Sequence, residues 1–243
     1  MSSSHFLNLK EKIREKVCQA FVYELEKDRH LHTPDSNKFH VTELVFNCPR
    51  QIFLRRVVGD FFISYPSIFR LAIGRKMHEI SILKEHEKRI EWQGIVGTVD
   101  EYENGVLIEK KTTVHAPRNA PYGHHVTQAE YYKVLLEETG NPVLHGFILY
   151  FDVSNVDDPL TIFEVPFRLY DVIKSEMIRK RNELLKIFGS LNFEQKFVIP
   201  ARKTSWLCKY CDYAYMCYMP IDKLQKIVDS ARKAKMGTIL FDL

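Results

Sequence analysis

Apolar residues recur at every third or fourth position in several stretches of the chain, the spacing of one buried face of an α-helix. This periodicity predicts helices over residues 6–26, 42–56, 68–87, 125–140, 169–189 and 224–235. Pro49 falls near the middle of the second stretch, and a proline interrupts the hydrogen bonds of a helix. We therefore expect that stretch to kink or to divide into two short helices.

Runs rich in β-branched and aromatic residues separate these helices. They predict an antiparallel meander over residues 89–93, 94–101 and 106–113, followed by a pair of strands over 143–153 and 161–167. A chain in which helices alternate with strands in this way typically folds as an α/β domain. We expect a mixed central sheet flanked by helices.

The second and third strands of the meander carry the most informative stretch. Asn104-Gly105 suits the positive φ angles of a tight two-residue turn, so the flanking strands should form a hairpin. The turn predicts a register in which Glu103 faces Val106, Tyr102 faces Leu107, Glu101 faces Ile108 and Asp100 faces Glu109. The last pair places two carboxylates side by side, which is unfavourable unless a cation compensates them.

Strand alternation puts Lys111 on the face of these carboxylates and turns Lys110 to the other face, where its substitution is expected to do little. Asp100, Glu109 and Lys111 together predict a site for a divalent cation and an attacking water molecule. The alternative is a solvent-exposed hairpin with incidental charge, because short patterns of acidic residues and lysine are common.

Two of the predicted helices carry polar side chains that can join this site. Gly74 and His78 are four residues apart and share a helix face, where the glycine would let another element come close. Gln128 and Tyr132 have the same spacing and can point at one object. A structural histidine and a core tyrosine are the alternatives, whereas a buried Gln128 would need hydrogen-bond partners.

The five cysteines favour a metal centre over a disulfide framework, because their number is odd and no export signal precedes them. Cys208, Cys211 and Cys217 form a Cys-x2-Cys pair with a third thiol six residues on, a strong arrangement for ligation. Cys48, beside the expected helix break, is the candidate for the fourth ligand, and Cys18 is interpreted as a small structural residue. Zinc and an iron-sulfur cubane both accept four thiolates, so the spacing leaves the choice open.

Length and charge set wide bounds. The 243 residues suffice for a single domain, with an N-terminal helical part at 1–66, a core at 67–190, a cysteine-containing segment at 191–220 and a tail at 221–243. The formal net charge of +4 permits a nucleic-acid partner without establishing one. No apolar run has the length of a membrane helix and no signal-peptide pattern is present, so a cytoplasmic protein is expected.

Together these motifs resemble the PD-(D/E)XK nuclease superfamily, specifically its RecB-like branch with an iron-sulfur cluster, and most closely the CRISPR-associated Cas-four exonucleases. The motifs that carry the resemblance run in order from residue 48 to 217: Cys48, Gly74-x3-His78, Gly97-x2-Asp100, Glu109-x-Lys111, Gln128-x3-Tyr132, Cys208, Cys211 and Cys217. The long segment before residue 40 and the basic tail after residue 220 depart from the bare family pattern.

The resemblance implies a restriction-endonuclease-like core in which one set of side chains holds Mg²⁺ or Mn²⁺ and a second set handles the attacking water and lines the site. The implied metal ligands are His78, Asp100 and Glu109; Lys111 positions or activates the water, and Gln128 and Tyr132 line the site. The resemblance also implies a four-iron four-sulfur (4Fe-4S) cluster. Its implied ligands are Cys48, Cys208, Cys211 and Cys217.

The implied activity is that of a metal-dependent DNA exonuclease or end-processing nuclease, acting in CRISPR spacer acquisition or in the recombination of a virus or plasmid. The implied partners are single-stranded DNA or DNA ends, and other CRISPR adaptation proteins or a helicase, with oligomer formation open. A non-catalytic iron-sulfur DNA-binding subunit is the alternative from a different class. The presence of Asp100, Glu109 and Lys111 together favours catalysis, since a dead relative has no need to keep all three. The chain has no Gly-x4-Gly-Lys-Ser/Thr phosphate loop, which argues against a fused motor.

Overall fold

The computed structural model describes residues 37–59, 65–189 and 198–234, together with the helical residues 11–13, 15–17 and 19–21. The helices of the main body are α2 (Val41–Phe46), α3 (Pro49–Val58), α4 (Tyr65–His78), α5 (Gly123–Glu138), α6 (Tyr170–Phe188), the short 3-10 helix η1 (Trp206–Tyr210), α7 (Ala214–Tyr218) and α8 (Ile221–Ala234). The strands are β1 (Phe39–His40), β2 (His86–Trp92), β3 (Ile95–Glu103), β4 (Val106–Thr113), β5 (His145–Asp152) and β6 (Leu160–Glu164). Part of the helix expected over residues 6–26 lies outside the described residues, as does Cys18.

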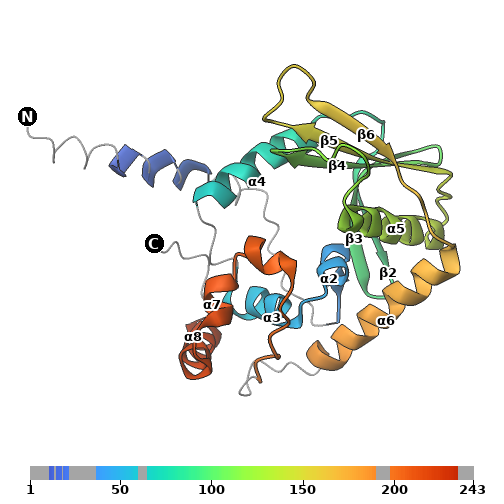
Figure 1. Ribbon diagram of the computed structural model, residues 1–243. Coiled ribbons are helices and arrows are strands. Elements are labelled where there is room, and N and C mark those ends of the chain that lie inside the picture. Colours follow the sequence, from blue (N-terminus) through green and yellow to red (C-terminus); the bar gives the residue numbers. More distant parts are fainter. Residues whose placement is uncertain are drawn as a thin grey trace, which may run out of the picture.

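A mixed sheet of six strands forms the centre of the fold (Figure 1). β2 pairs antiparallel with β3 along one edge, while β1 and β4 pair with different parts of its other edge. β5 lies parallel to β4, and β6 lies antiparallel to β5. The parallel pair is joined through α5, as the strand-helix-strand connection of α/β proteins requires. The prediction of an α/β fold with a mixed sheet is confirmed.

The hairpin between β3 and β4 turns at Asn104 and Gly105, which adopt φ angles of 49° and 85°. The predicted register is confirmed for the pairs Glu103 and Val106, Tyr102 and Leu107, and Glu101 and Ile108. The backbone pairing of Asp100 with Glu109 is wrong, because the strands separate after the third pair. The Asp100 carboxylate there accepts a hydrogen bond from the backbone N–H of Lys110 at 2.7 Å, so a side chain replaces the missing strand partner.

The stretch with Pro49 divides into α2 and α3, the second of the two predicted alternatives. Asn47 ends α2 in a left-handed conformation with φ of 44°, and Pro49 begins α3. Proline suits this first helical position because the N–H that it lacks would have no partner there. Cys48 lies in the extended link between the two helices.

α4 ends at His78, so the prediction that this helix reaches residue 87 is wrong. The Lys110 ammonium donates to the carbonyl oxygens of His78 and Ile80, each at 2.8 Å. The backbone N–H groups of residues 82 and 83 donate to the Glu101 carboxylate, at 3.1 and 2.7 Å. These contacts with the sheet replace the hydrogen bonds of a further helical turn, although the apolar periodicity continues.

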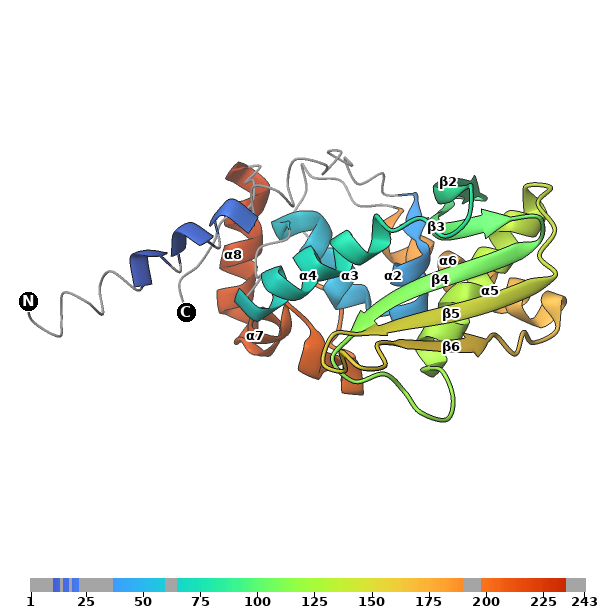
Figure 2. The ribbon, with the colours of Figure 1, turned by 90° about the horizontal axis from the view of Figure 1, so that it is seen from above.

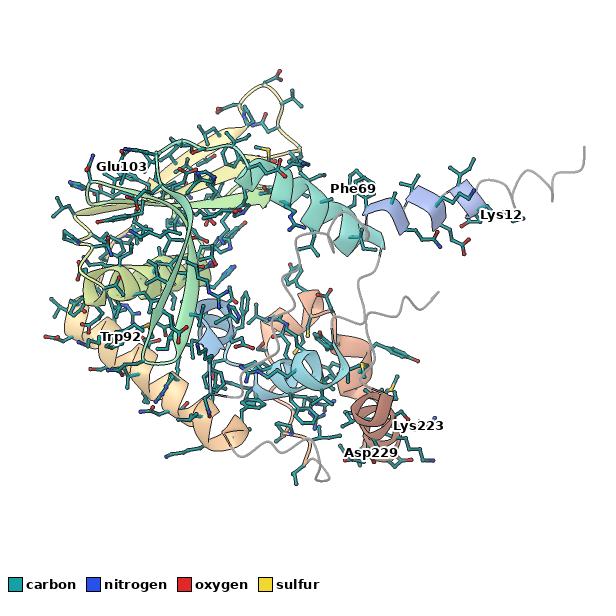
Figure 3. All side chains as sticks on the ribbon, turned by 180° about the vertical axis from the view of Figure 1, so that it is seen from behind. Lys12, Phe69, Trp92, Glu103, Lys223 and Asp229 are labelled. Atoms are coloured by element: carbon teal, nitrogen blue, oxygen red, sulfur yellow. The ribbon has the colours of Figure 1, made fainter. Side chains whose placement is uncertain are left out.

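The helices form two groups around the sheet (Figures 1 and 2). α5 lies across one face of the sheet and α6 packs against α5, while α3, α7 and α8 form a helical group to one side. α4 extends from the sheet over this group, and Figure 3 marks it with Phe69. Buried apolar residues from Phe39 to Ala231 form one continuous core through both groups. Among the described residues, no helix combines the length and the apolar character needed to cross a membrane.

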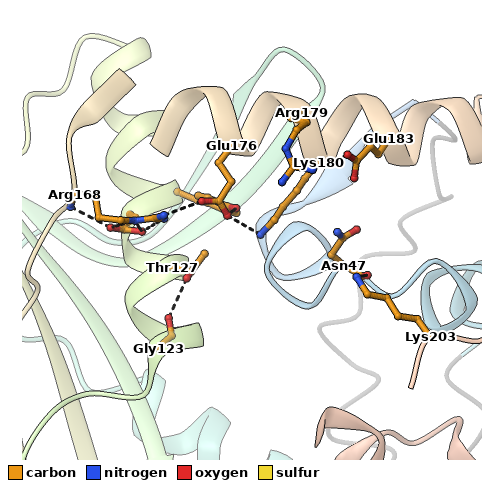
Figure 4. A network of polar contacts seen from close by, with 11 residues as sticks. Asn47, Gly123, Thr127, Arg168, Glu176, Arg179, Lys180, Glu183 and Lys203 are labelled. Carbon is orange, nitrogen blue, oxygen red and sulfur yellow. Dashed lines mark hydrogen bonds and ion pairs between the residues drawn. The ribbon is translucent and has the colours of Figure 1, made fainter. Parts of the chain in front are cut away.

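Arg168 ties α5 to α6 through a polar network (Figure 4). Its Nε donates to the buried Glu130 of α5 at 2.9 Å, and its Nη1 donates to Glu176 of α6 at 2.8 Å. Glu176 also accepts a hydrogen bond from Tyr131 at 2.8 Å and pairs with Lys180 at 2.9 Å. Burial alone would raise the pKa of Glu176, but these donors outweigh it and lower the pKa to about 2.

Candidate active site

Asp100 and Glu109 project from β3 and β4 just beyond the point where the two strands stop pairing. Both side chains belong to buried residues, which are 8% and 1% exposed. Asp100 Oδ1 lies 3.0 Å from Nδ1 of His78, the last residue of α4, and Oδ2 accepts the Lys110 N–H. The end of α4 and the splayed hairpin therefore bring His78, Asp100 and Glu109 to one place.

Glu109 shows how strongly this place favours a cation. Burial raises the pKa of Glu109 to about 7 and the charge of Asp100 adds to the rise, while Lys111 and His78 oppose it. Glu109 Oε1 contacts the Lys111 ammonium, but Oε2 is buried with no hydrogen-bond partner among the described residues. An unsatisfied buried oxygen costs about 1–3 kcal/mol. A cation next to Oε2 would remove that cost.

Lys111 lies between the acidic pair and α5. Its Nζ contacts Glu109 and donates to Gln128 Oε1 at 3.1 Å, so two of the three ammonium donors have partners. Gln128 Nε2 in turn donates to the Tyr132 hydroxyl at 3.0 Å. Burial and the charge of Glu109 raise the pKa of Tyr132, which keeps its hydroxyl neutral. The i, i+4 spacing of Gln128 and Tyr132 on α5 thus brings the two side chains into contact with each other, and Gln128 alone contacts Lys111.

Gly97 is the position on β3 that lets Tyr132 approach. A Cβ at Gly97 would lie 2.7 Å from Tyr132 Cε1 and 3.0 Å from Leu135 Cδ1. Gly74 has no such role, because a Cβ there would meet no described atom within 4 Å. The expectation that Gly74 admits a neighbouring element is therefore wrong, and the close approach occurs at Gly97.

Lys110 lies on the face of β4 opposite Lys111, as alternation predicts, and it is held there by a buried ion pair that the expectation of a small effect on substitution did not foresee. Its side chain is 1% exposed and its Nζ lies 2.7 Å from Glu101 Oε1. A lone charge left in such a place is strongly destabilising. The sequence signal for this pair is an acidic and a basic residue on inward-facing positions of adjacent strands.

An aromatic cluster that the motifs did not reveal adjoins Lys111. Tyr150 of β5 is the register partner of Lys111, and its hydroxyl lies 2.8 Å from His125 Nδ1 and accepts the Tyr122 N–H at 3.0 Å. Tyr122 stacks on His124 with an interplanar angle of 17°. Burial and the charge of Lys111 lower the pKa of His124, and they lower that of His125 to about 2. Both imidazoles are therefore neutral rings at physiological pH.

Cys48, in the link before α3, lies close enough to Cys211 and Cys217 of the segment from η1 to α7 for their charges to interact. All four described thiols are free and partly exposed: Cys48, Cys208, Cys211 and Cys217. Burial raises the pKa of Cys211, and the neighbouring Cys48 and Cys217 add to the rise. Burial and Cys48 likewise raise the pKa of Cys217.

Two further contacts hold this cysteine segment to α3. Arg50 donates to Pro200 O at 2.7 Å and to Cys217 O at 3.2 Å, and its charge counteracts the raised pKa of the Cys217 thiol. The Ser205 N–H donates to Cys208 Sγ at 3.5 Å. Thiolates accept such hydrogen bonds, and a nearby guanidinium favours the charged form that binds metal. The donor set and its surroundings suit a thiolate-ligated centre.

Within residues 37–59, 65–189 and 198–234, no three His, Cys, Asp or Glu side chains stand already arranged around a metal position. At the acidic pair, the Lys111 ammonium contacts Glu109 and the His78 ring contacts Asp100 instead. The partnerless Glu109 Oε2 and the paired carboxylates fit a hard divalent cation, which prefers oxygen ligands.

Comparison with known proteins defines the fold and no more. No protein-family model and no curated protein matches the chain. Among solved structures, one described as "Crystal structure of SSO0001" matches with a TM-score of 0.56 and 19% identity, over 82% of this chain and 95% of its own length. At this identity the likeness shows a shared α/β architecture.

Proposed function

We propose that this protein is a divalent-metal-dependent deoxyribonuclease of the RecB-like, PD-(D/E)XK kind, which hydrolyses phosphodiester bonds at the site formed by Asp100, Glu109 and Lys111. One observation carries the proposal: Asp100 and Glu109 are both buried at this place, Glu109 Oε2 has no hydrogen-bond partner among the described residues, and the Lys111 ammonium contacts Glu109. Such a concentration of charge is costly in a purely structural role. Its cost is offset when the site binds a cation.

Asp100 and Glu109 would hold the ion, and His78 would join them through its ring. A divalent cation at such a site lowers the pKa of bound water and stabilises the charge that develops on phosphorus. The two carboxylates approach from different strands, and the His78 ring approaches from the end of α4. The three groups are thus carried by separate rigid elements, which keeps their relative positions fixed.

Lys111 would position the attacking water and stabilise charge. Glu109 and Gln128 take two of its three donors, which would leave the third for the attacking water or the substrate. Gln128 is itself held by Tyr132, so Lys111 is restrained through α5 as well as β4. This restraint reduces the conformational freedom that the ammonium must lose when it meets a substrate.

A nucleic-acid substrate is supported by the surroundings of the site. Neutral aromatic rings adjoin the lysine: Tyr122 is 42% exposed and stacks on His124. Nucleobases stack on such rings, and lysine contacts phosphate. The resemblance to Cas-four exonucleases supports DNA ends as the substrate and CRISPR spacer acquisition, or recombination of a virus or plasmid, as the setting.

We also propose that Cys48, Cys208, Cys211 and Cys217 hold a 4Fe-4S cluster with a structural role. Four free thiols from distant segments support a four-thiolate centre, and the family resemblance favours iron and sulfur over zinc. A cluster there would join α3 to the segment from η1 to α7. Iron and sulfide analysis with a visible spectrum distinguishes the two metals.

The test is a cleavage assay on single strands and duplexes labelled at the 5′ or the 3′ end, in Mn²⁺ and in EDTA. The wild type should cleave only with the ion, and Asp100→Asn should lower the rate by about a thousandfold or more, since metal and nucleophile are both affected. Glu103→Gln, in the same hairpin, is the matched control and should cut normally. A wild type that binds DNA without cutting it would support the non-catalytic subunit instead.

A further inference from the structure

Lys110 and Glu101 form a buried ion pair that the proposed chemistry does not use. Their side chains are 1% and 0% exposed, and Lys110 Nζ lies 2.7 Å from Glu101 Oε1. They lie on the face of the hairpin opposite Lys111. Removing two charges from water is costly, so a pair like this is stable only when every donor and acceptor is satisfied.

Both partners are satisfied through the backbone that follows α4. The three donors of Lys110 reach Glu101, His78 O and Ile80 O, at 2.7, 2.8 and 2.8 Å. Glu101 also accepts the backbone N–H groups of residues 82 and 83. Burial alone would raise the pKa of Glu101, but these donors lower it. The pair therefore joins the end of α4 to β3 and β4.

This junction determines where α4 ends. The last carbonyl groups of a helix lack partners within the helix, and a cation beside them is favourable for the helix dipole. Lys110 of β4 provides that cation at the end of α4. Side-chain packing also holds α4, where Ile68 is buried although Phe69 and Leu71 are exposed.

Lys110 also reaches both members of the His78 and Asp100 contact. Its ammonium binds the carbonyl oxygen of His78, and its backbone N–H binds Asp100 Oδ2 at 2.7 Å. The other oxygen of Asp100 lies 3.0 Å from His78 Nδ1. One residue thus connects the main chain of His78 with the carboxylate that its ring meets.

We propose that Lys110 and Glu101 are positioning residues, which hold His78 against Asp100 so that the His78 ring can serve as a ligand of the divalent ion. Neither residue touches the ion or the substrate. The inference rests on the proposed function, because it takes Asp100 and Glu109 to be the ion site. It adds a pair of residues, on the far face of the hairpin, on which the affinity for the ion depends.

The test uses Glu101→Gln combined with Lys110→Met, which removes both charges, keeps the shape of the acid and leaves one acceptor oxygen for the N–H groups of residues 82 and 83. The measurement is Mn²⁺ binding to the full-length protein by titration calorimetry. We expect the dissociation constant to rise about tenfold or more, the usual cost of losing a group that orients a metal ligand. The matched control is Glu130→Gln, at an acid that is 1% exposed and paired with Arg168. It should leave the Mn²⁺ dissociation constant within about twofold of the wild-type value.

A double-mutant cycle separates positioning from general destabilisation. His78→Ala is made in the wild type and in the pair-substituted protein. If the pair acts through His78, its loss should weaken Mn²⁺ binding about tenfold in the wild type but less than about twofold in the pair-substituted protein. Equal factors in the two backgrounds would overturn the inference, as would wild-type affinity in a cooperatively melting pair variant.

Glu101→Gln alone carries the same comparison if the double substitution does not fold, because it keeps the shape of the side chain and one of its two acceptor oxygens. Weaker Mn²⁺ binding supports the inference, and unchanged binding overturns it. A wild type that neither binds Mn²⁺ nor cuts DNA would overturn the proposed function itself. Wild-type binding that is indifferent to the pair would overturn the positioning role alone.

Discussion

Lys110 and Lys111 are adjacent in sequence, yet their ammonium groups contact different carboxylates on opposite faces of β4. Lys110 pairs with Glu101 in the interior, and Lys111 contacts Glu109 at the candidate active site. Their side chains are 1% and 20% exposed. Two neighbouring lysines thus have separate surroundings, one in the interior of the fold and one at the site proposed for chemistry.

Replacing each lysine by methionine should separate a role in the fold from a role in chemistry. Lys110→Met leaves Glu101 buried without its partner and should cost about 3–5 kcal/mol in the free energy of unfolding. Lys111→Met also removes the partner of a buried carboxylate, but burial and Asp100 already raise the pKa of Glu109 to about 7, so this carboxyl can take up a proton. The substitution should therefore cost less stability than Lys110→Met, yet it should abolish cleavage. Urea unfolding and a cleavage assay on both proteins measure the difference. A Lys111→Met protein that cuts at the wild-type rate would contradict the role given to Lys111.

Gly97→Ala should damage the site through packing. The new methyl group would lie 2.7 Å from the Tyr132 ring, so Tyr132 must move, and we expect a loss of about 1–3 kcal/mol in stability together with slower cleavage. Gly74→Ala is the matched control, because the new methyl group meets no described atom within 4 Å and the helix interior favours alanine by about 1 kcal/mol. Thermal melting of both proteins tests whether Gly97→Ala lowers the melting temperature while Gly74→Ala raises it. Equal destabilisation would show that the approach at Gly97 is not tight.

The Glu176 network between α5 and α6 predicts a pH dependence. The folded pKa of Glu176 is lowered from 4.5 to about 2, so the carboxylate stabilises the fold above its ordinary pKa. This stabilisation is lost as the pH falls from about 4.5 toward about 2. Glu176→Gln should therefore cost about 1–2 kcal/mol at pH 7, allowing for solvent screening, and less at pH 4. Urea unfolding at both pH values tests this, and a cost that grows on acidification would contradict it.

The proposed cluster on the cysteines predicts a loss of both visible absorption and stability when one ligand is removed. Cys48→Ser should bleach the visible absorption of the purified protein and lower its melting temperature, because the ligands join distant segments and metal binding contributes to folding. Cys18→Ser is the control and should leave the spectrum unchanged. Anaerobically purified protein that contains zinc and no iron would contradict the cluster while leaving a structural centre in place.

The hairpin shows how far local rules lead. Asn104-Gly105 set the register, and the alternation of side chains placed Lys111 with the carboxylates and Lys110 away from them. The separation of β3 and β4 was not predictable, because it depends on a hydrogen bond that the backbone N–H of Lys110 on β4 donates to the Asp100 carboxylate. Sequence patterns describe residues that are close along the chain, whereas the hydrogen bond between Asp100 and Lys110 depends on how the folded strands diverge.

The end of α4 and the aromatic cluster could not be predicted from the sequence either, because both depend on tertiary contacts. Apolar periodicity continues past His78, but Lys110 and Glu101 form hydrogen bonds with the backbone groups that would make the next helical turn. Tyr150 meets Lys111 only because β5 lies parallel to β4 in one particular register. The motifs located the residues at the acidic pair, while their surroundings came from tertiary packing.

The central claim is that Asp100 and Glu109 hold a divalent ion, and melting curves across a Mn²⁺ titration test it most directly. Binding to the folded state should raise the melting temperature of the wild type with the logarithm of ion concentration once the site saturates. Asp100→Asn keeps the shape but removes one of two repelling charges, so it should melt no lower than the wild type in EDTA and gain little from Mn²⁺. An Asp100→Asn protein that gains the full wild-type stabilisation would show that Asp100 does not hold the ion.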